Sequence, residues 1–312
     1  MITSPASSIT KAASKQTFTT IRFLVDRDRV EDAYRAYAYF RWVDDTLDAD
    51  PGAVLSEVEA SGRRAFLERQ KSLLESCYRG ETPREVNIQE KMLVELVRGD
   101  TEKNSGLETY LRNMMLVMDF DAQRRGKWVS QIELSEYTLW LAMAVTEAMH
   151  YFIGHGDYSP RDEGRYLAVS AAHITHMLRD TYDDVQAGYY NIPREVLEAN
   201  HIGPQDVHSD AYRHWVKSQV HLARENFKAG RGYLARVRNP RCRLAGFAYT
   251  ARFEWLLDTI EREGYHLRPQ YDERKRLGTG LRMSWLALSS IINLREAGTL
   301  SRPVVSHPPG KL

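Results

Sequence analysis

Two short acidic segments carry the residue types best suited to chemistry in this chain. Each holds three aspartates within five residues: Asp44, Asp45 and Asp48, and Asp180, Asp183 and Asp184. A spacing of four residues puts the first and last carboxylate of each segment on one face of a helix. Like charges at this spacing destabilise an isolated helix by about a few tenths of a kcal/mol, so each face calls for a cation.

A solvated acidic surface is the ordinary interpretation of one such segment taken alone. Two segments with the same spacing favour a shared site instead. Mg²⁺ prefers oxygen ligands and is usually held by one or two carboxylates together with substrate phosphates. Neither segment has the glycine-centred loop of a calcium-binding EF-hand. The sequence therefore predicts Mg²⁺ as cofactor, bound with a diphosphate between two helices.

The elements that must position these carboxylates are predicted to be helices throughout. Apolar residues recur at helical spacing from Phe18 nearly to Leu294, and no Asn-Gly or Asp-Gly hairpin turn joins alternating runs. No break is long enough to link separate units, and no solenoid repeat is present. We expect an all-α, single-domain bundle over residues 15–300, with a flexible arm at 1–14 and a disordered tail at 301–312.

Composition excludes several classes of partner. The 43 Lys and Arg nearly balance the 42 Asp and Glu, so no overall field favours nucleic acid. Cys77 and Cys242 are too few for a disulfide framework, which suits a reducing compartment. No apolar run reaches the ~18 residues of a transmembrane helix. We expect a soluble, cytoplasmic enzyme, with loose association with a membrane surface left open.

The acidic segments and their flanks resemble the two aspartate motifs of the squalene/phytoene synthases. Tyr37–Asp48 resembles the first aspartate motif of that family. Leu178–Gly188, followed by Ile192 and Pro193, resembles the second. The likeness begins near Ser14–Phe18 and extends to about Arg282. It implies the isoprenoid-synthase helical bundle around a central cavity, in which Mg²⁺ bridges all six aspartates and an allylic prenyl diphosphate.

Metal ions and cationic side chains would stabilise the departing diphosphate, so that no protein nucleophile is needed. Arg41 lies one turn before Asp44 and is expected to contact the leaving group; an intrahelical salt bridge is the less favoured alternative. The substrate-binding set comprises Lys15, Thr17, Tyr37, Arg41, Arg179 and Phe253.

Two positions depart from the family pattern. Family members that join two prenyl diphosphates usually have Gln-x-x-Asn before the second motif, where this chain has His173 and His176. Neighbouring carboxylates are expected to favour the imidazolium form and to place its titration near working pH; the alternative is a hydrogen-bonded interior residue. Glu147 stands where a small residue leaves room for a second chain, and we expect it to fill that room. Its alternative is a salt bridge to a neighbouring helix.

These departures preserve ionisation of one allylic diphosphate and weaken the site for a second. Some squalene-synthase-like enzymes prenylate aromatic acceptors such as carbazoles. We therefore expect transfer of the prenyl group to a small-molecule, non-prenyl, aromatic acceptor in secondary metabolism, with Glu147, His173 or His176 as the catalytic base. The main alternative is head-to-head condensation to squalene, presqualene diphosphate or phytoene. A non-catalytic helical assembly protein is disfavoured, because all six aspartates are retained.

Overall fold

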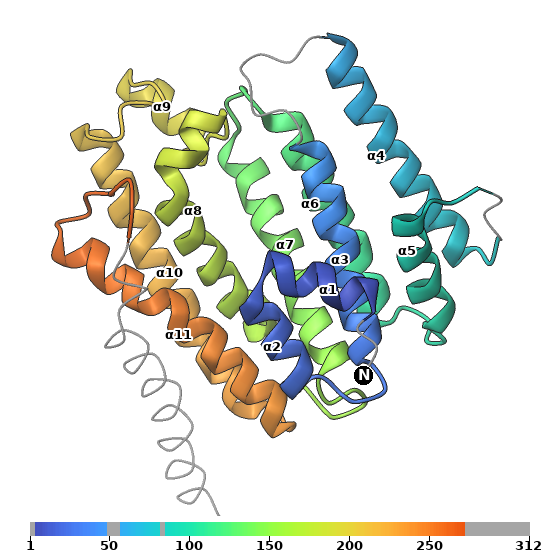
Figure 1. Cartoon of the computed structure of the whole chain (residues 1–312). Helices are drawn as coiled ribbons and strands as arrows, with labels where there is room; N and C mark the ends of the chain where they lie inside the picture. Colours follow the sequence, from blue (N-terminus) through green and yellow to red (C-terminus); the bar gives the residue numbers. More distant parts are fainter. Residues whose placement is uncertain (1–3, 49–56, 82–84, 272–312) are drawn as a thin grey trace, which may run out of the picture.

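The computed structural model describes residues 4–48, 57–81 and 85–271 (Figure 1). Within these ranges the chain is helical and contains no strand, which confirms the predicted all-α class. The elements are α1 Pro5–Ala13, α2 Lys15–Leu24, α3 Val30–Leu47, α4 Glu57–Tyr78, α5 Ile88–Gly99, α6 Gly106–Arg124, α7 Gln131–Phe152, the 3-10 helix η1 Glu163–Tyr166, α8 Leu167–Ala187, α9 Arg194–Asn200, α10 Asp210–Arg236 and α11 Pro240–Arg262.

Side-chain caps define where several of these helices begin. Asn87 and Glu90 form a reciprocal capping box at the start of α5, and Ser130 and Glu133 form another at the start of α7. Such boxes satisfy two backbone N–H groups that a helix N-terminus leaves without partners. Asn239 caps α11, where proline follows at the first helical position. Local sequence therefore specifies the starts of helices that surround the interior.

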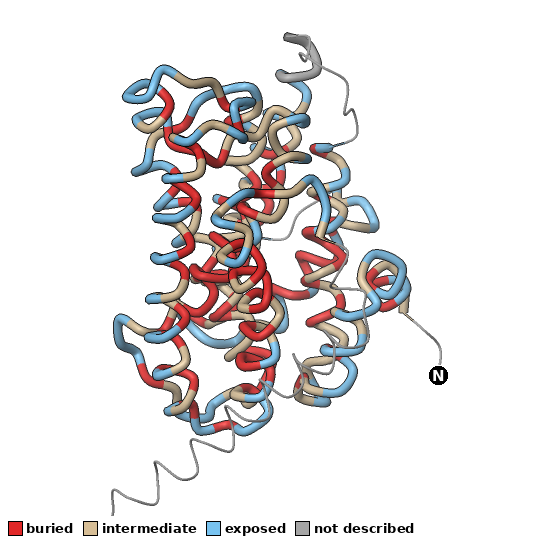
Figure 2. Tube along the Cα trace, turned by 90° about the vertical axis from the view of Figure 1, so that its left-hand side faces the viewer, coloured by how far each residue is buried: buried red, intermediate tan, exposed pale blue. Residues whose placement is uncertain are grey.

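Helices α6 and α7 lie in the middle of the bundle, with α3 on one side and α8, α10 and α11 on the other (Figure 1). Buried residues run along the facing sides of these helices, and exposed residues cover the outside (Figure 2). The buried apolar residues form two clusters. One lies mainly within α1–α7, and the other joins α8, α9, α10 and α11.

Small residues allow the closest helix contact in the second half of the bundle. A side-chain carbon added at Gly230 of α10 would lie 2.5 Å from the backbone nitrogen of Ala168 in α8. No side chain fits at that separation. The two backbones therefore approach so closely because position 230 is glycine.

The prediction of a flexible arm over residues 1–14 is wrong for most of that segment. Pro5–Ala13 form α1, which packs against α3 and buries Ala6 and Thr10. Ser4 caps this helix, and its hydroxyl donates to Glu31 Oε2 at 3.0 Å. The Ser- and Ala-rich composition reflects close packing rather than disorder. The expected tail at 301–312, and the domain end at 300, lie outside the described residues.

Among the described residues, no helix combines the length and the apolar character that crossing a membrane requires.

Candidate active site

The two acidic segments lie at the same end of the bundle. Helices α3 and α8 both point their C-terminal ends toward the top of Figure 1. Asp44 occupies the last turn of α3, Asp48 is its C-cap, and Asp184 occupies the last turn of α8. Neither last turn contains a basic residue. Because a helix C-terminus already carries partial negative charge, these carboxylates add to an unfavourable local potential.

The pKa values of the carboxylates reflect this crowding. Burial, followed by the charge of Asp48, raises the pKa of Asp44 to about 6. Burial, followed by the charge of Asp180, raises the pKa of Asp184 to about 7. Asp121 contributes to both increases, so the acidic ends of α3 and α8 share one electrostatic environment. Groups of this kind are stabilised by a cation.

Asp121 on α6 is a site residue that the sequence did not reveal. Its carboxylate accepts hydrogen bonds from the Tyr137 hydroxyl at 2.8 Å and from Arg124 Nε at 2.7 Å. Burial raises its pKa, and Asp48 contributes to the same effect. A single aspartate on a helix, next to an arginine three residues later, is too common a pattern to be singled out. Only the fold brings Asp121 between the two motifs.

A chain of hydrogen bonds joins the end of α6 to the end of α8. Arg124 Nη1 donates to Asn191 Oδ1 at 2.9 Å, and Asn191 Nδ2 donates to Asp184 Oδ2 at 2.7 Å. The backbone N–H of Gly126 donates to the carbonyl of Gly188 at 2.7 Å. Gly188 ends α8 with a φ of 85°, a left-handed conformation that favours glycine. These contacts hold Asp184 in a defined position.

Arg41 forms the intrahelical salt bridge that we expected to be the less favoured arrangement. Its guanidinium lies 3.4 Å from Asp44 and also pairs with Asp45. All three side chains remain about half exposed. Arg41 therefore lies beside the acidic site, and its contact with a diphosphate remains a prediction.

Asp180 is similarly paired with basic groups on its own helix. Arg179 forms two bonds of 2.6 Å with its carboxylate, and His176 Nε2 lies 3.1 Å from Oδ2. Asp183 is exposed, and it lies about 100° around the helix from Asp184. The second motif thus has Asp180 and Asp184 near one face and Asp183 on another.

His173 lies in the interior beside the acidic end. Its ring packs edge-on against Tyr137, with 4.9 Å between ring centroids, and neither ring nitrogen has a hydrogen-bond partner. Burial, followed by the charges of His176 and Arg124, lowers its pKa to about 3. The expectation that nearby carboxylates would favour its imidazolium form is wrong, because desolvation dominates. His173 is neutral at physiological pH.

Glu147 does not fill the central cavity. Its carboxylate accepts two hydrogen bonds from Arg165, at 2.6 and 2.8 Å, and one from the Tyr166 hydroxyl at 2.9 Å. Burial acts to raise its pKa, but the bonds and charge of Arg165 outweigh it and hold the pKa below the usual value. Tyr137, which contacts Asp121, is ten residues before Glu147, so Glu147 lies about 15 Å along α7 from that part of the acidic site. The salt bridge to a neighbouring element, which we named as the alternative, is the arrangement observed.

A largely apolar cavity of about 390 Å³ lies between α2, α3, α6, α7 and α11. Thr17 and Tyr37 line it, as do Val145 and Ala148, which flank Glu147 on α7. Tyr37 precedes Asp44 by seven residues, about 10 Å along α3, and none of the acidic residues lines the cavity.

Four predicted substrate-binding residues lie outside the lining of this cavity: Arg41 and Arg179, which pair with aspartates as described above, and Lys15 and Phe253. Lys15 is exposed at the first position of α2. Phe253 is buried in α11, with its ring centroid 6.2 Å from that of His176.

The donor set suits Mg²⁺ that is bound together with a phosphate group. In the described ranges, no three His, Cys, Asp or Glu side chains lie close enough to hold a metal ion by themselves. The acidic ends of α3 and α8 nevertheless offer hard carboxylate oxygens in a shared negative field. Mg²⁺ commonly takes one or two carboxylates and completes its coordination with phosphate oxygens and water. The residues fit that arrangement.

Three comparisons relate this chain to known proteins. The family model described as squalene/phytoene synthase matches residues 10–280. A 15-cis-phytoene synthase from Synechocystis is 32% identical over 115 residues, which cover 35% of this chain and 33% of that protein. The match thus spans about a third of the length of this curated relative.

Solved structures show the same fold. Squalene synthase HpnC from Alicyclobacillus acidocaldarius aligns with a TM-score of 0.63 and 19% identity, over 84% of this chain and 94% of that one. A dehydrosqualene synthase in complex with a ligand aligns with a TM-score of 0.66 and 16% identity, over 93% and 95% of the two chains. The architecture is therefore the all-α isoprenoid synthase fold.

Proposed function

This chain belongs to the squalene/phytoene synthase family, and we propose that it ionises an allylic prenyl diphosphate and transfers the prenyl group to an aromatic acceptor. The observation that supports the ionisation step is the shared field of Asp44, Asp121 and Asp184, which lies about 10 Å along α3 from Tyr37 of the apolar cavity. Mutually repelling carboxylates and an apolar cavity within one bundle suit a substrate with a metal-bound diphosphate head and a hydrocarbon tail.

Asp44, Asp48, Asp180 and Asp184 would hold Mg²⁺ in this site. When bound, the metal would stabilise negative charge on the departing diphosphate. Arg41 and Arg179 would exchange their carboxylate partners for diphosphate oxygens, which form equally strong charge-assisted hydrogen bonds.

The cavity walls would hold the prenyl tail and exclude water as the allylic C–O bond breaks. The ring faces of Tyr37, Tyr110 and Tyr249, which line the cavity, would stabilise the resulting allylic cation.

We assign the second half of the reaction to His173. A ring carbon of the acceptor forms a bond with the allylic carbon, and the proton on that ring carbon must then be removed. The protonated acceptor ring is a strong acid, so even an imidazole whose pKa is about 3 can accept this proton if one of its ring nitrogens is unpaired. His173 does not itself line the central cavity, so the acceptor would have to reach its ring. His173 is neutral, and both of its ring nitrogens lack partners. Of the three bases predicted from sequence, Glu147 is held by Arg165 and His176 is paired with Asp180.

Head-to-head condensation is the second candidate, and one observation favours it. Glu147 points toward Arg165, so Val145 and Ala148 face an open cavity that can take a second prenyl chain. The sequence departure at Glu147 therefore gives less support to an aromatic acceptor than we expected.

The two candidates differ in their products. Purified protein is incubated with Mg²⁺ and geranyl, farnesyl or geranylgeranyl diphosphate, with and without carbazole, and products are identified by mass spectrometry. A prenylated carbazole would support aromatic transfer, whereas a hydrocarbon or cyclopropyl diphosphate made from two prenyl units would establish the second candidate. Absence of Mg²⁺-dependent diphosphate release with every substrate would contradict both.

Asp44→Asn tests whether the acidic site is needed for ionisation of the diphosphate. We expect diphosphate release to fall by about 10²-fold or more, because the variant loses a charged metal ligand. Asp210→Asn is the matched control, since Asp210 is an exposed aspartate at the start of α10. Equal rates for the two variants would refute the role of Asp44.

A further inference from the structure

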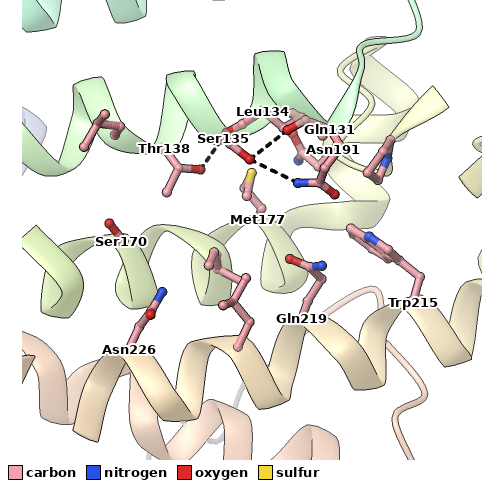
Figure 3. Close-up of a pocket in the computed structure, with 14 residues that line it drawn as sticks. Gln131, Leu134, Ser135, Thr138, Ser170, Met177, Asn191, Trp215, Gln219 and Asn226 are labelled. Atoms are coloured by element: carbon pink, nitrogen blue, oxygen red, sulfur yellow. Dashed lines mark hydrogen bonds between the residues drawn. The ribbon is translucent and has the colours of Figure 1, made fainter. Parts of the chain in front are cut away.

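A second pocket lies between α7, α8 and α10, separate from the central cavity (Figure 3). Its volume is about 190 Å³, and none of its 14 lining residues is ionisable. No residue lines both this pocket and the central cavity. Burying a charged ligand without a counter-charge is strongly unfavourable, so the lining excludes a diphosphate.

A buried hydrogen-bond donor without a partner marks one side of the pocket. Trp215 is 7% exposed, and its Nε1–H has no acceptor in the structure. Figure 3 shows its indole reaching from α10 toward Asn191, with Gln219 beside it. Buried tryptophan N–H groups usually find an acceptor. A ligand atom that accepts a hydrogen bond would satisfy this donor.

The rest of the lining combines apolar walls with side-chain amides. Ile174 and Met177 of α8 belong to the lining, and Figure 3 shows Met177 between α7 and α10. Leu139 of α7 and Leu222 of α10 are 46% and 42% exposed, which is unusual for leucine. Apolar side chains, a methionine sulfur and an indole all pack favourably against a planar aromatic ring.

We propose that this pocket binds an uncharged, planar molecule of one or two rings that carries a hydrogen-bond acceptor. Its size agrees, because an apolar cavity of about 150 Å³ in another protein holds benzene. The Trp215 N–H supplies the specific contact, and the neutral lining selects against charged molecules. This binding is independent of prenyl transfer and requires neither Mg²⁺ nor a diphosphate.

The pocket also adjoins the acidic site through one residue. Asn191 lines the pocket and donates the hydrogen bond to Asp184. A molecule bound here therefore lies next to the contact that positions that carboxylate.

Quinoline and naphthalene form a matched pair of probes, since both are two-ring molecules and only quinoline has an acceptor nitrogen. Binding to the full-length protein at pH 7.5 is measured by ligand-observed NMR titration. We expect quinoline to bind at least about tenfold more tightly than naphthalene, which corresponds to one additional hydrogen bond. Equal affinities, or no binding of quinoline, would overturn the proposal.

Substitutions in the pocket test whether the probes bind there. Trp215→Phe removes the donor and should reduce quinoline affinity to the level of naphthalene. Trp255→Phe is the control, because Trp255 also has a buried Nε1–H without a partner but does not line the pocket. Leu139→Arg, at an exposed position, should block binding of both probes without requiring a change in the core. Unchanged quinoline binding by folded Trp215→Phe or by Leu139→Arg would place the molecule elsewhere and refute the assignment.

Discussion

At the scale of single residues, the site depends on groups whose burial opposes their charge. Asp44 and Asp184 have raised pKa values because they are partly buried and lie near other carboxylates. His173 has a lowered pKa for the related reason that burial disfavours its cation. Acids and a histidine whose pKa values are shifted in opposite directions in one part of a fold are typical of functional sites.

The raised carboxylate pKa values predict how stability depends on pH without metal. The folded state holds protons on Asp44 and Asp184 up to about pH 6 and 7, whereas an unfolded aspartate releases them near 3.8. Raising the pH through this interval should therefore destabilise the fold. Asp184→Asn should be more stable than wild type at pH 8 by on the order of 1 kcal/mol, after allowance for solvent screening. Thermal unfolding at pH 5 and 8 with a chelator measures this, and Asp210→Asn should show no such gain.

His173→Phe separates proton removal from ionisation. Phenylalanine keeps a ring against Tyr137 but cannot accept a proton. We expect prenylated product to fall by about 10²-fold, while Mg²⁺-dependent release of diphosphate continues. The measured quantity is the ratio of the two products, and His214→Phe on the exposed side of α10 provides the control. An unchanged ratio would remove His173 from the mechanism.

At the scale of elements, helix identity followed from sequence, but the direction of individual side chains did not. The periodic apolar residues predicted helices, and the two acidic segments lie on helices, α3 and α8, as expected. Glu147 was misplaced because Val145, Glu147 and Ala148 are close in sequence, and only packing decides which of them faces the cavity. The place of Asp121 in the site could not be predicted from sequence, because it depends on how α6 packs relative to α3 and α8.

The end of α8 should be sensitive to a change at Gly188. Alanine at a φ of 85° costs about 1–2 kcal/mol, and it would also displace the turn that holds Asp184. Gly80 is a matched control, because its φ is 77° and no atom lies within 4 Å of an added carbon. We expect Gly188→Ala and Gly80→Ala to lose similar stability in urea unfolding, and only Gly188→Ala to weaken Mg²⁺-dependent activity. Equal activity in both variants would contradict the positioning role.

The contact between α8 and α10 provides a test within one helix. Gly230→Ala would introduce a clash with Ala168, and we expect a loss of about 1–3 kcal/mol. Gly232→Ala, two residues later, meets nothing within 4 Å and should stabilise the helix by up to about 1 kcal/mol. Urea unfolding of the two variants measures the difference, and a similar effect for both would disprove the close contact.

At the scale of the whole molecule, the acidic site joins two differently packed halves. Asp44 and Asp121 belong to helices of the first core cluster, whereas Asp184 follows the part of α8 that belongs to the second. A ligand held by both sets would bind the folded protein alone and raise its stability, by about 2.7 kcal/mol at a concentration 100 times the dissociation constant. Mg²⁺ and pyrophosphate together should therefore raise the melting temperature more than the sum of each alone, and simple additivity would contradict a joint site.

The proximity of these carboxylates has a consequence for the metal-free protein. With no cation bound, α3, α6 and α8 bring like charges to one end of the helical bundle, and that end is pushed toward opening. A divalent ion held there would cancel this repulsion and draw the three helix ends together.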